Sequence, residues 1–225
     1  MRKRRRKQLE DIKVTGLSKV IKEKEVLKDI NLSMERGKIY GFYGRNGSGK
    51  TMLFRAVCGL IKPTSGEIYI FGKKLGKDIS FPESLGLIIE SVGFWPQYTG
   101  FQNLKFLASI KNIISDDEIK EAIRSVGLDP DDKKIYKKYS LGMKQRLGIA
   151  QAIMEKPDLI VLDEPTNALD SEGVSLVRNI LLKERDRGAV IMIASHNRED
   201  IDLLSDEKYM MDNGRLYKVS EENAK

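Results

Sequence analysis

The stretch GRNGSGKT, residues 44–51, decides the fold, because it fits the phosphate-loop pattern G-x-x-x-x-G-K-[ST]. Backbone N–H groups in such a loop point inward and form a cradle for anions. Lys50 adds a cation for the β- and γ-phosphates, and the Thr51 hydroxyl can ligate Mg²⁺. A helix beginning near Lys50 turns its positive dipole end toward the same phosphates. The candidate binding residues of this stretch are Gly44, Arg45, Asn46, Gly47, Ser48, Gly49, Lys50, Thr51 and the adjoining Met52.

The segments on either side supply the setting that this motif requires. KIYGFYG, residues 38–44, is an apolar run of strand length. TMLFRAVCGL, residues 51–60, carries its apolar side chains at helical spacing as far as Leu60. The alternative, an ordinary glycine-rich turn, is disfavoured because a strand, a glycine loop and a helix occur in the expected order.

The composition of the chain is that of a globular protein. The 225 residues are 40% hydrophobic and 32% charged, enough for one compact domain with a subdomain. Apolar runs such as residues 189–194 are far shorter than the roughly 18 residues that cross a bilayer, so we expect no membrane span and no signal peptide. The single cysteine, Cys58, excludes an intrachain disulfide and fits a reducing compartment as a small core residue.

The net charge of +7 is concentrated near the N-terminus. The basic residues there are Arg2, Lys3, Arg4, Arg5, Arg6 and Lys7. This segment, Arg2 to Lys7, is either a solvated tail or a peripheral contact with anionic lipid headgroups or nucleic acid, and the first alternative is preferred. The remainder is nearly balanced in charge, so we expect no nucleic-acid-binding face.

Strand-like and helical segments alternate along the chain. Strands are expected at residues 12–17, 26–34, 66–72, 85–89, 159–162 and 189–194, with a charged turn at 22–25 and a hairpin at 208–218. Helical periodicity covers residues 102–155, 171–187 and 200–204. In the first block Leu104, Leu107, Ala108 and Ile110 are predicted to share one face, and Ser115 with Glu118 resembles a capping box. Aliphatic strands between helices indicate an α/β fold with a parallel sheet covered on both faces.

The segment LIVLDE, residues 159–164, predicts the second half of the site. An aliphatic strand that ends in two acids places Asp163 and Glu164 at the carboxyl edge of the sheet, where ligands bind in such folds. Asp163 is expected to hold Mg²⁺ through water, and Glu164 to polarise the attacking water. The alternative is an acidic strand end before a turn at Pro165.

A third motif, YSLGMKQRLGIAQAI at residues 139–153, completes a set with the phosphate loop, LDEPTNALD at 162–170 and the pair Ser195–His196. Together they resemble the ATP-binding subunit of an ABC transporter, over residues 12–218. The resemblance implies a P-loop NTPase core with a mostly parallel sheet, an antiparallel β subdomain and an inserted helical subdomain. It implies a single domain over 1–225, with a basic tail at 1–10, the core at 11–89 and 156–225, and the helical subdomain at 90–155.

The resemblance also assigns roles to residues. Asp163 corresponds to the Walker B aspartate and Glu164 to the catalytic glutamate. Ser140 and Gly142 lie in the signature motif that meets a phosphate, and Asp170 ends the D-loop at residues 167–170. His196 corresponds to the switch histidine; a lone histidine is commonly structural, but its place after an aliphatic strand favours phosphate sensing.

Three positions depart from the family pattern. Leu141 replaces the first glycine of the usual LSGGQ, so its side chain must point away from phosphate. Glu90 takes the place of the Q-loop glutamine, where it can ligate Mg²⁺ or its water but adds negative charge beside the γ-phosphate. Ile21 stands where many members stack adenine on an aromatic ring, so only apolar packing is expected. These departures resemble the bacitracin and lantibiotic export or immunity subgroup.

The function implied by this resemblance is ATP hydrolysis with Mg²⁺ that powers a separate transmembrane permease. The expected place is the cytoplasm, on the inner face of the cell membrane, and the expected cargo is a peptide antibiotic, drug or lipid-like substrate for export. Two such subunits, identical or different, would sandwich ATP. Two alternatives stay open: a soluble ATP-driven regulator of nucleic acid or ribosomes, and an ATP-binding scaffold with weak turnover.

Overall fold

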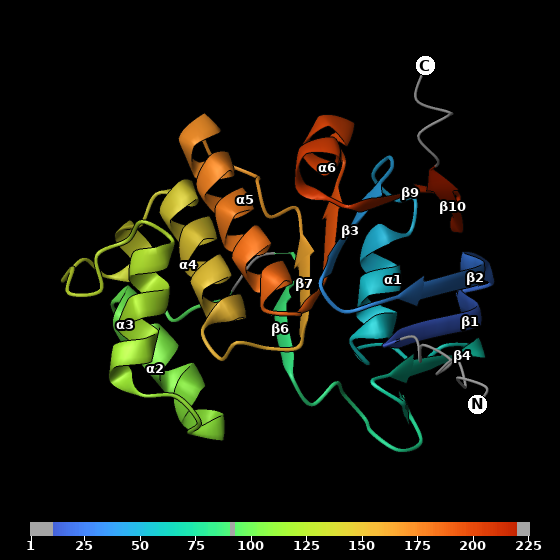
Figure 1. The fold of residues 1–225 in the computed structure, drawn as a ribbon, viewed down its shortest axis with the longest axis horizontal. Coiled ribbons are helices and arrows are strands. Elements are labelled where there is room, and N and C mark those ends of the chain that lie inside the picture. The colour runs from blue at the N-terminus through green and yellow to red at the C-terminus, as the bar shows by residue number, and fades with distance from the viewer. Residues whose placement is uncertain (1–10, 91–92, 220–225) are drawn as a thin grey trace, which may run out of the picture.

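The computed structural model describes residues 11–90 and 93–219, which form two sheets and a set of helices (Figure 1). The predicted basic segment, residues 2–7, lies outside the described residues. The strands are β1 (Ile12–Ile21), β2 (Lys24–Met34), β3 (Lys38–Tyr43), β4 (Ser65–Ile70), β5 (Lys73–Lys74), β6 (Leu85–Ile88), β7 (Leu159–Asp163), β8 (Val190–Ser195), β9 (Glu207–Asp212) and β10 (Arg215–Val219). The helices are α1 (Lys50–Val57), α2 (Gly100–Lys111), α3 (Asp116–Ser125), α4 (Leu141–Ile153), α5 (Ser171–Asp186) and α6 (Arg198–Leu204), with a short 3-10 turn at Tyr136–Lys138.

The larger sheet has the order β10-β9-β3-β8-β7-β6 and is parallel except for the edge pair β9–β10. Every residue of β7 and β8 is buried. Burial on both faces explains why these strands are aliphatic throughout rather than alternating with polar residues. The strand predicted at 159–162 is therefore confirmed, with Asp163 as one further residue at its carboxyl end. The strand predicted at 189–194 is confirmed one residue later along the chain, at 190–195.

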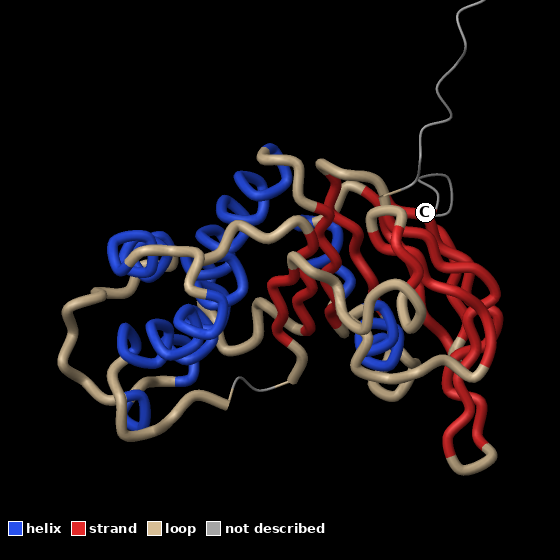
Figure 2. Tube along the Cα trace, turned by 90° about the horizontal axis from the view of Figure 1, so that it is seen from below, coloured by secondary structure: helices blue, strands red, loops and turns tan. Residues whose placement is uncertain are grey.

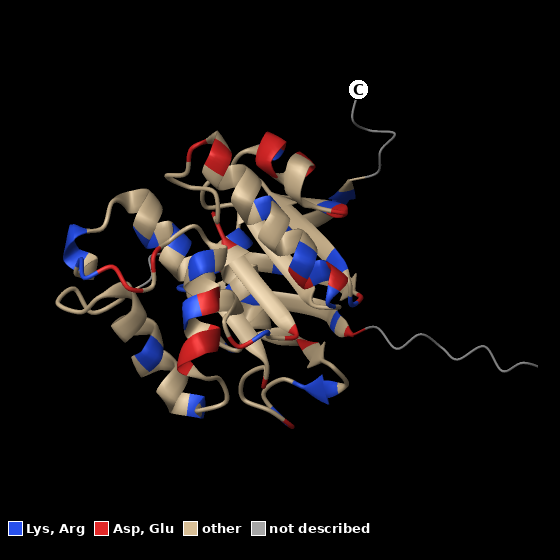
Figure 3. Cartoon of the chain, turned by 60° about the vertical axis from the view of Figure 1, so that its left-hand side comes forward, with Lys and Arg blue, Asp and Glu red and all other residues tan. Residues whose placement is uncertain are grey.

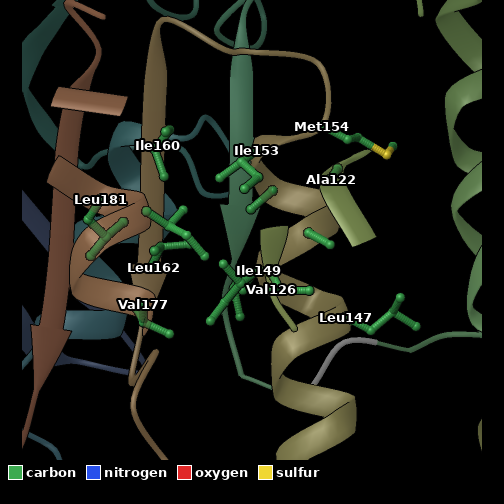
Figure 4. Packing of buried hydrophobic residues seen from close by; sticks show 14 of the residues in the cluster. Ala122, Val126, Leu147, Ile149, Ile153, Met154, Ile160, Leu162, Val177 and Leu181 are labelled. Atoms are coloured by element: carbon green, nitrogen blue, oxygen red, sulfur yellow. The ribbon is translucent and has the colours of Figure 1, made fainter. Parts of the chain in front are cut away.

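Side chains of β7 point alternately into two separate hydrophobic clusters. Ile160 and Leu162 belong to the cluster that packs against α4 and α5, whereas Leu159 and Val161 belong to the cluster around α1 and the smaller sheet. Figure 4 shows Ile160 and Leu162 with residues of α4 and α5 in the first of these clusters. In Figure 1 the sheet accordingly lies between α4 and α5 on one side and α1 on the other.

The smaller sheet, β2-β1-β4-β5, is antiparallel and covers the far side of α1, as predicted for a β subdomain. Its first strand is longer than the strand predicted at 12–17, because β1 continues through Ser18, Lys19 and Val20 to Ile21. Lys22 and Glu23, both at positive φ of 45° and 68°, form the turn. Backbone pairing with β2, which is independent of side-chain polarity, carries the strand beyond its apolar part. In Figure 2 most helices lie on one side of the molecule and most strands on the other, with α1 on the side of the strands.

The helical block contains α2, α3 and α4, and the capping box at its second helix is confirmed. Ser115 Oγ accepts from the Glu118 N–H, and a Glu118 carboxylate oxygen accepts from the Ser115 N–H. The predicted shared face is wrong at one position: Leu104 is fully buried but Ile110 is 78% exposed. Six residues correspond to about 240° around a helix, so Ile110 points away from the core.

Two further predictions concern α1. This helix ends at Val57 rather than reaching Leu60, because Gly59 turns the chain at a φ of 76° and leaves Leu60 exposed. Cys58, expected to be a small core residue, is fully buried. Burial raises the pKa of its thiol to about 12, so that the side chain stays protonated within the apolar core.

Packing of β6 against α4 gives a test of the fold. A Cβ on Gly86 would lie 1.8 Å from the carbonyl oxygen of Ala152, whereas a Cβ on Gly93 would meet nothing within 4 Å. We expect Gly86→Ala to lower the free energy of unfolding by about 3 kcal/mol or more, because two backbones must separate. Gly93→Ala should change it by less than about 0.5 kcal/mol. Urea unfolding measures both, and equal effects of the two substitutions would contradict this packing.

Candidate functional site

A cavity of 520 Å³ lies where the phosphate loop meets the carboxyl end of β7. Its lining residues are Val26, Asn46, Gly47, Gly49, Lys50, Thr51, Met52, Glu90, Gln145, Asp163, Glu164 and Asn167. The loop and the two acids, predicted from separate motifs, are therefore brought together in one site. The parallel register explains this, because the carboxyl ends of parallel strands meet at one edge of the sheet.

The phosphate loop is held open by glycines at positions where a side chain has no room. A Cβ on Gly44 would lie 2.2 Å from the carbonyl oxygen of Met211, and one on Gly49 would lie 3.0 Å from that of Val26. Gly49, at a φ of 114°, is the N-cap of α1 and supplies no side chain to cap the helix. The first N–H groups of α1 are thus left for an anion.

Two side chains of the loop are arranged for a ligand. Lys50 is buried, and its ammonium donates to the Gly44 and Arg45 carbonyl oxygens at 2.6 and 3.3 Å. Burial lowers the pKa of Lys50, although the Glu164 and Asp163 charges oppose this shift. Within residues 11–90 and 93–219, Ser48 Oγ is the buried side-chain atom that has no hydrogen-bond partner. An unpartnered hydroxyl beside a buried cation fits a loop that completes its hydrogen bonds with phosphate oxygens.

Thr51 and Asp163 form the candidate metal site. The Thr51 hydroxyl donates to Asp163 Oδ2 over 2.6 Å, and Asp163 is 8% exposed. Burial raises the pKa of Asp163; the Thr51 hydrogen bond opposes this rise, and the Glu164 charge adds to it. The described residues hold no cluster of three His, Cys, Asp or Glu side chains suited to a metal. Two protein oxygens nevertheless fit Mg²⁺, which usually keeps water and takes substrate phosphate oxygens as further ligands.

Glu164 and His196 are in direct contact. His196 Nδ1 lies 2.9 Å from Glu164 Oε2, and the His196 backbone N–H donates to Glu164 Oε1 over 2.8 Å. The Ser195 hydroxyl lies 3.3 Å from Glu164 Oε2. A carboxylate accepts, so this contact favours the tautomer with the proton on Nδ1 and leaves Nε2 without one in the neutral ring. The backbone of Glu164 is itself constrained, at a φ of 53°.

Gln145 is a site residue that the sequence analysis did not identify. From α4 its amide donates to the carbonyl oxygens of Glu164 and Pro165, at 3.1 and 3.0 Å. These bonds tie the helical block to the backbone of the glutamate. It lies five residues after Ser140 in the segment SLGMKQR, and no local pattern in that segment indicates that its amide faces the sheet.

Glu90 lines the cavity at the end of β6, as expected for a residue near the phosphate. Its Oε1 accepts from Arg55 Nη2 over 2.7 Å. Ile21, by contrast, is not among the described residues that line the cavity; it lies at the tip of the β1–β2 hairpin and is 40% exposed. Because β1 extends beyond the predicted strand, Ile21 lies at the tip of the hairpin, away from the cavity. The apolar side chain that lines the cavity from this hairpin is instead Val26, on β2.

Ser140, Gly142 and Asp170 lie together in a second hollow and do not line the first cavity. Ser140 caps α4 by accepting from the Met143 N–H, and Asp170 caps α5 by accepting from the Gly173 N–H. The Leu141 side chain is 72% exposed at the surface. Two helix N-termini thus adjoin one hollow, apart from the phosphate loop of the same chain.

Comparisons with known proteins agree with this geometry. A family model described as "ABC transporter" matches residues 27–167. The chain is 56% identical over 205 residues to the ABC transporter ATP-binding protein YybJ of Bacillus subtilis (strain 168), covering 91% of this chain and 94% of YybJ. It is 41% identical over 207 residues to the bacitracin transport ATP-binding protein BcrA of Enterococcus faecalis, covering 91% of this chain and 67% of BcrA.

Two further similarities extend this result. The lantibiotic transport ATP-binding protein SrtF of Streptococcus pyogenes is 34% identical over 196 residues, with 87% of this chain and 84% of SrtF covered. A solved structure of an ATP-binding subunit of an ABC transporter superposes with a TM-score of 0.84 at 25% identity, covering 94% of this chain and 90% of the other.

The buried Asp163 is predicted to cost the nucleotide-free protein stability. Because its pKa is raised on folding, stability falls as the pH rises from the unfolded value, about 4, through the folded value. Asp163→Asn removes this ionisation, so we expect the free energy of unfolding at pH 7 to rise by about 1 kcal/mol. Urea unfolding at pH 7 and below pH 4 tests this, since the gain should vanish in acid. A variant less stable than its parent at pH 7 would refute the argument.

Loss of the Gln145 contact is predicted to weaken both the fold and the reaction. Gln145→Leu leaves two carbonyl oxygens without a donor, so we expect a loss of about 1–2 kcal/mol in unfolding free energy. ATP turnover should fall at least tenfold while ATP affinity changes less than threefold, because the phosphate loop is untouched. Gln151→Leu, on the same helix, is the control. Equal losses in the two variants would argue against a specific contact.

Proposed function

Because this chain belongs to the ABC transporter family and is one of its ATPases, we propose that it powers a separate transmembrane permease that exports a peptide antibiotic, drug or lipid-like substrate. The family and the bacitracin and lantibiotic subgroup predicted from the motifs are confirmed, as is the α/β cassette fold. The observation that carries the proposal is the convergence of Lys50, Thr51, Asp163 and Glu164 on one cavity.

Binding of ATP is assigned to the phosphate loop. Residues of the loop and of the start of α1 line the cavity, Lys50 supplies the cation, and Ser48 has a hydroxyl without a hydrogen-bond partner. Thr51 and Asp163 would hold Mg²⁺, which when bound neutralises charge on the β- and γ-phosphates. Val26 offers an apolar surface at the same cavity.

Hydrolysis is assigned to Glu164. Its carboxylate lines the cavity, and it would accept a proton from the attacking water. His196 and Ser195 hold that carboxylate by hydrogen bonds, so they position the base before the reaction begins. With its proton on Nδ1, the imidazole can donate from Nε2 to a phosphate only after it takes up a second proton.

A second ATP-binding subunit would complete the site. Ser140, Gly142 and Asp170 of one chain lie apart from its own phosphate loop, around a separate hollow. In an antiparallel pair, the signature residues of one subunit would cap the phosphate held by the other, and the start of α4 would add its helix dipole. ATP would then favour the closed pair by binding across it.

The permease is proposed to meet the helical subdomain, residues 90–155. No helix in the described part of the chain has the length and apolarity needed to span a membrane. We propose that force reaches the membrane through a contact of this subdomain with the permease at the inner face of the cell membrane. Export of an antibiotic-like cargo is supported by the similarity to a bacitracin and a lantibiotic transport protein.

The test uses Glu164→Gln, which keeps the shape of the side chain but removes the proton acceptor. We expect ATP hydrolysis to fall by a factor of about 10² or more, with ATP binding retained and an ATP-bound dimer accumulating. Phosphate release and size-exclusion chromatography with ATP and Mg²⁺ measure these effects. Glu121→Gln, an exposed glutamate on α3, is the matched control. Full activity in the Glu164 variant would rule out the assigned role.

A further inference from the structure

Arg55, to which no sequence motif assigns a role, forms an ion pair with Glu90. It lies on α1, whose first residues Lys50 and Thr51 line the cavity, and its Nη2 donates to Glu90 Oε1 over 2.7 Å. Glu90 belongs to a different segment, just after β6, 35 residues further along the chain. The pair therefore joins the helix behind the phosphate loop to the rim of the cavity.

The charges that line the cavity indicate that the Arg55–Glu90 pair does more than join two segments at the surface. Three carboxylates line the cavity, those of Glu90, Asp163 and Glu164, whereas Lys50 is the one cation among the described lining residues. The anionic phosphates of ATP must enter this space. A carboxylate without a nearby cation repels them, and Arg55 is the cation that contacts Glu90.

Stability alone does not account for the pair. The Arg55 and Glu90 side chains are 34% and 64% exposed, and ion pairs of this exposure contribute little to the stability of a protein. The backbone of Glu90 is in the left-handed region, with a φ of 61°, a conformation that few glutamates adopt. The arrangement thus fixes the direction of one carboxylate at the cavity without adding much to the fold.

Resting on the assignment of ATP to this cavity, we propose that Arg55 is a positioning residue: its guanidinium holds the Glu90 carboxylate and offsets its charge, so that ATP phosphates can bind beside it. Arg55 itself does not line the cavity. It acts on the nucleotide through Glu90, so its effect must depend on the carboxylate at position 90.

This dependence gives a double-mutant test. ATP affinity is measured by calorimetry on the full chain, with Mg²⁺ and again with EDTA, for Arg55→Met, Glu90→Gln and the double variant. We expect Arg55→Met to weaken ATP binding about fivefold to tenfold in both conditions, because Glu90 is left uncompensated. With EDTA, which removes any contribution of Glu90 through Mg²⁺, Glu90→Gln should bind ATP at least as tightly as the parent. In both conditions the double variant should bind within twofold of Glu90→Gln. Thermal unfolding of the nucleotide-free proteins separates these effects from loss of structure.

Two controls keep the test specific. Arg178→Met removes an exposed arginine of α5 that does not line the cavity, and it should leave ATP affinity unchanged. Arg55→Lys keeps the positive charge and should bind ATP within threefold of the parent. The ATP affinity of this variant can be measured even where Arg55→Met fails to fold.

The outcomes separate this inference from the assignment it rests on. Arg55→Met binding as tightly as the parent, or a double variant as weak as Arg55→Met, would overturn the role of Arg55. If the role of Arg55 is overturned in this way, the assignment of ATP to the cavity still holds when the parent binds ATP normally and Lys50→Ala does not. A parent protein that does not bind ATP, or a Lys50→Ala variant that binds equally well, would refute the site and the role of Arg55 together.

Discussion

Burial of β7 is the constraint on which the site depends. Its aliphatic residues, from Leu159 to Leu162, have no exposed surface, and the strand ends directly in Asp163. Parallel pairing places Asp163 opposite Ala194 and places Tyr43, the last residue before the phosphate loop, opposite Ser195. One hydrogen-bonded register therefore sets the loop, the acids and the histidine at the same edge. A slip of β7 by one residue would move the two acids relative to the phosphate loop and turn every side chain of the strand to the other face of the sheet.

The same burial sets a conflict between stability and activity. The cavity keeps a cation and two acids away from much of the solvent, which is costly for each group unless it is paired. Lys50 meets part of this cost with two carbonyl oxygens and Asp163 with the Thr51 hydroxyl, whereas Ser48 remains without a partner. Charges elsewhere are spread over helices and strands, as Figure 3 shows, and are largely exposed. Among the described residues, the burial of charged side chains is thus concentrated where chemistry is assigned.

Motifs with a local mechanism were predictable from the sequence, and contacts between distant segments were not. The phosphate loop, the strand of β7 and the Ser115 capping box each follow from neighbouring residues. The contacts of Gln145 and Arg55 were not predicted, because their partners lie 19 and 35 residues away in the sequence. Only the folded chain brings these residues together. Helical spacing gave Leu104 correctly but not Ile110, since apolar residues also occur on exposed faces.

The alternation of side chains along β7 has a consequence for how such a protein can change. Ile160 and Leu162 serve one hydrophobic cluster, Leu159 and Val161 the other, and the sheet separates the two. Substitutions on opposite sides of the sheet have few shared neighbours, so their effects should combine independently. The helical side, which we propose to meet the permease, can therefore change in sequence while the nucleotide side keeps its packing. With the two clusters separated in this way, residues of one cluster can be substituted without repacking the residues of the other.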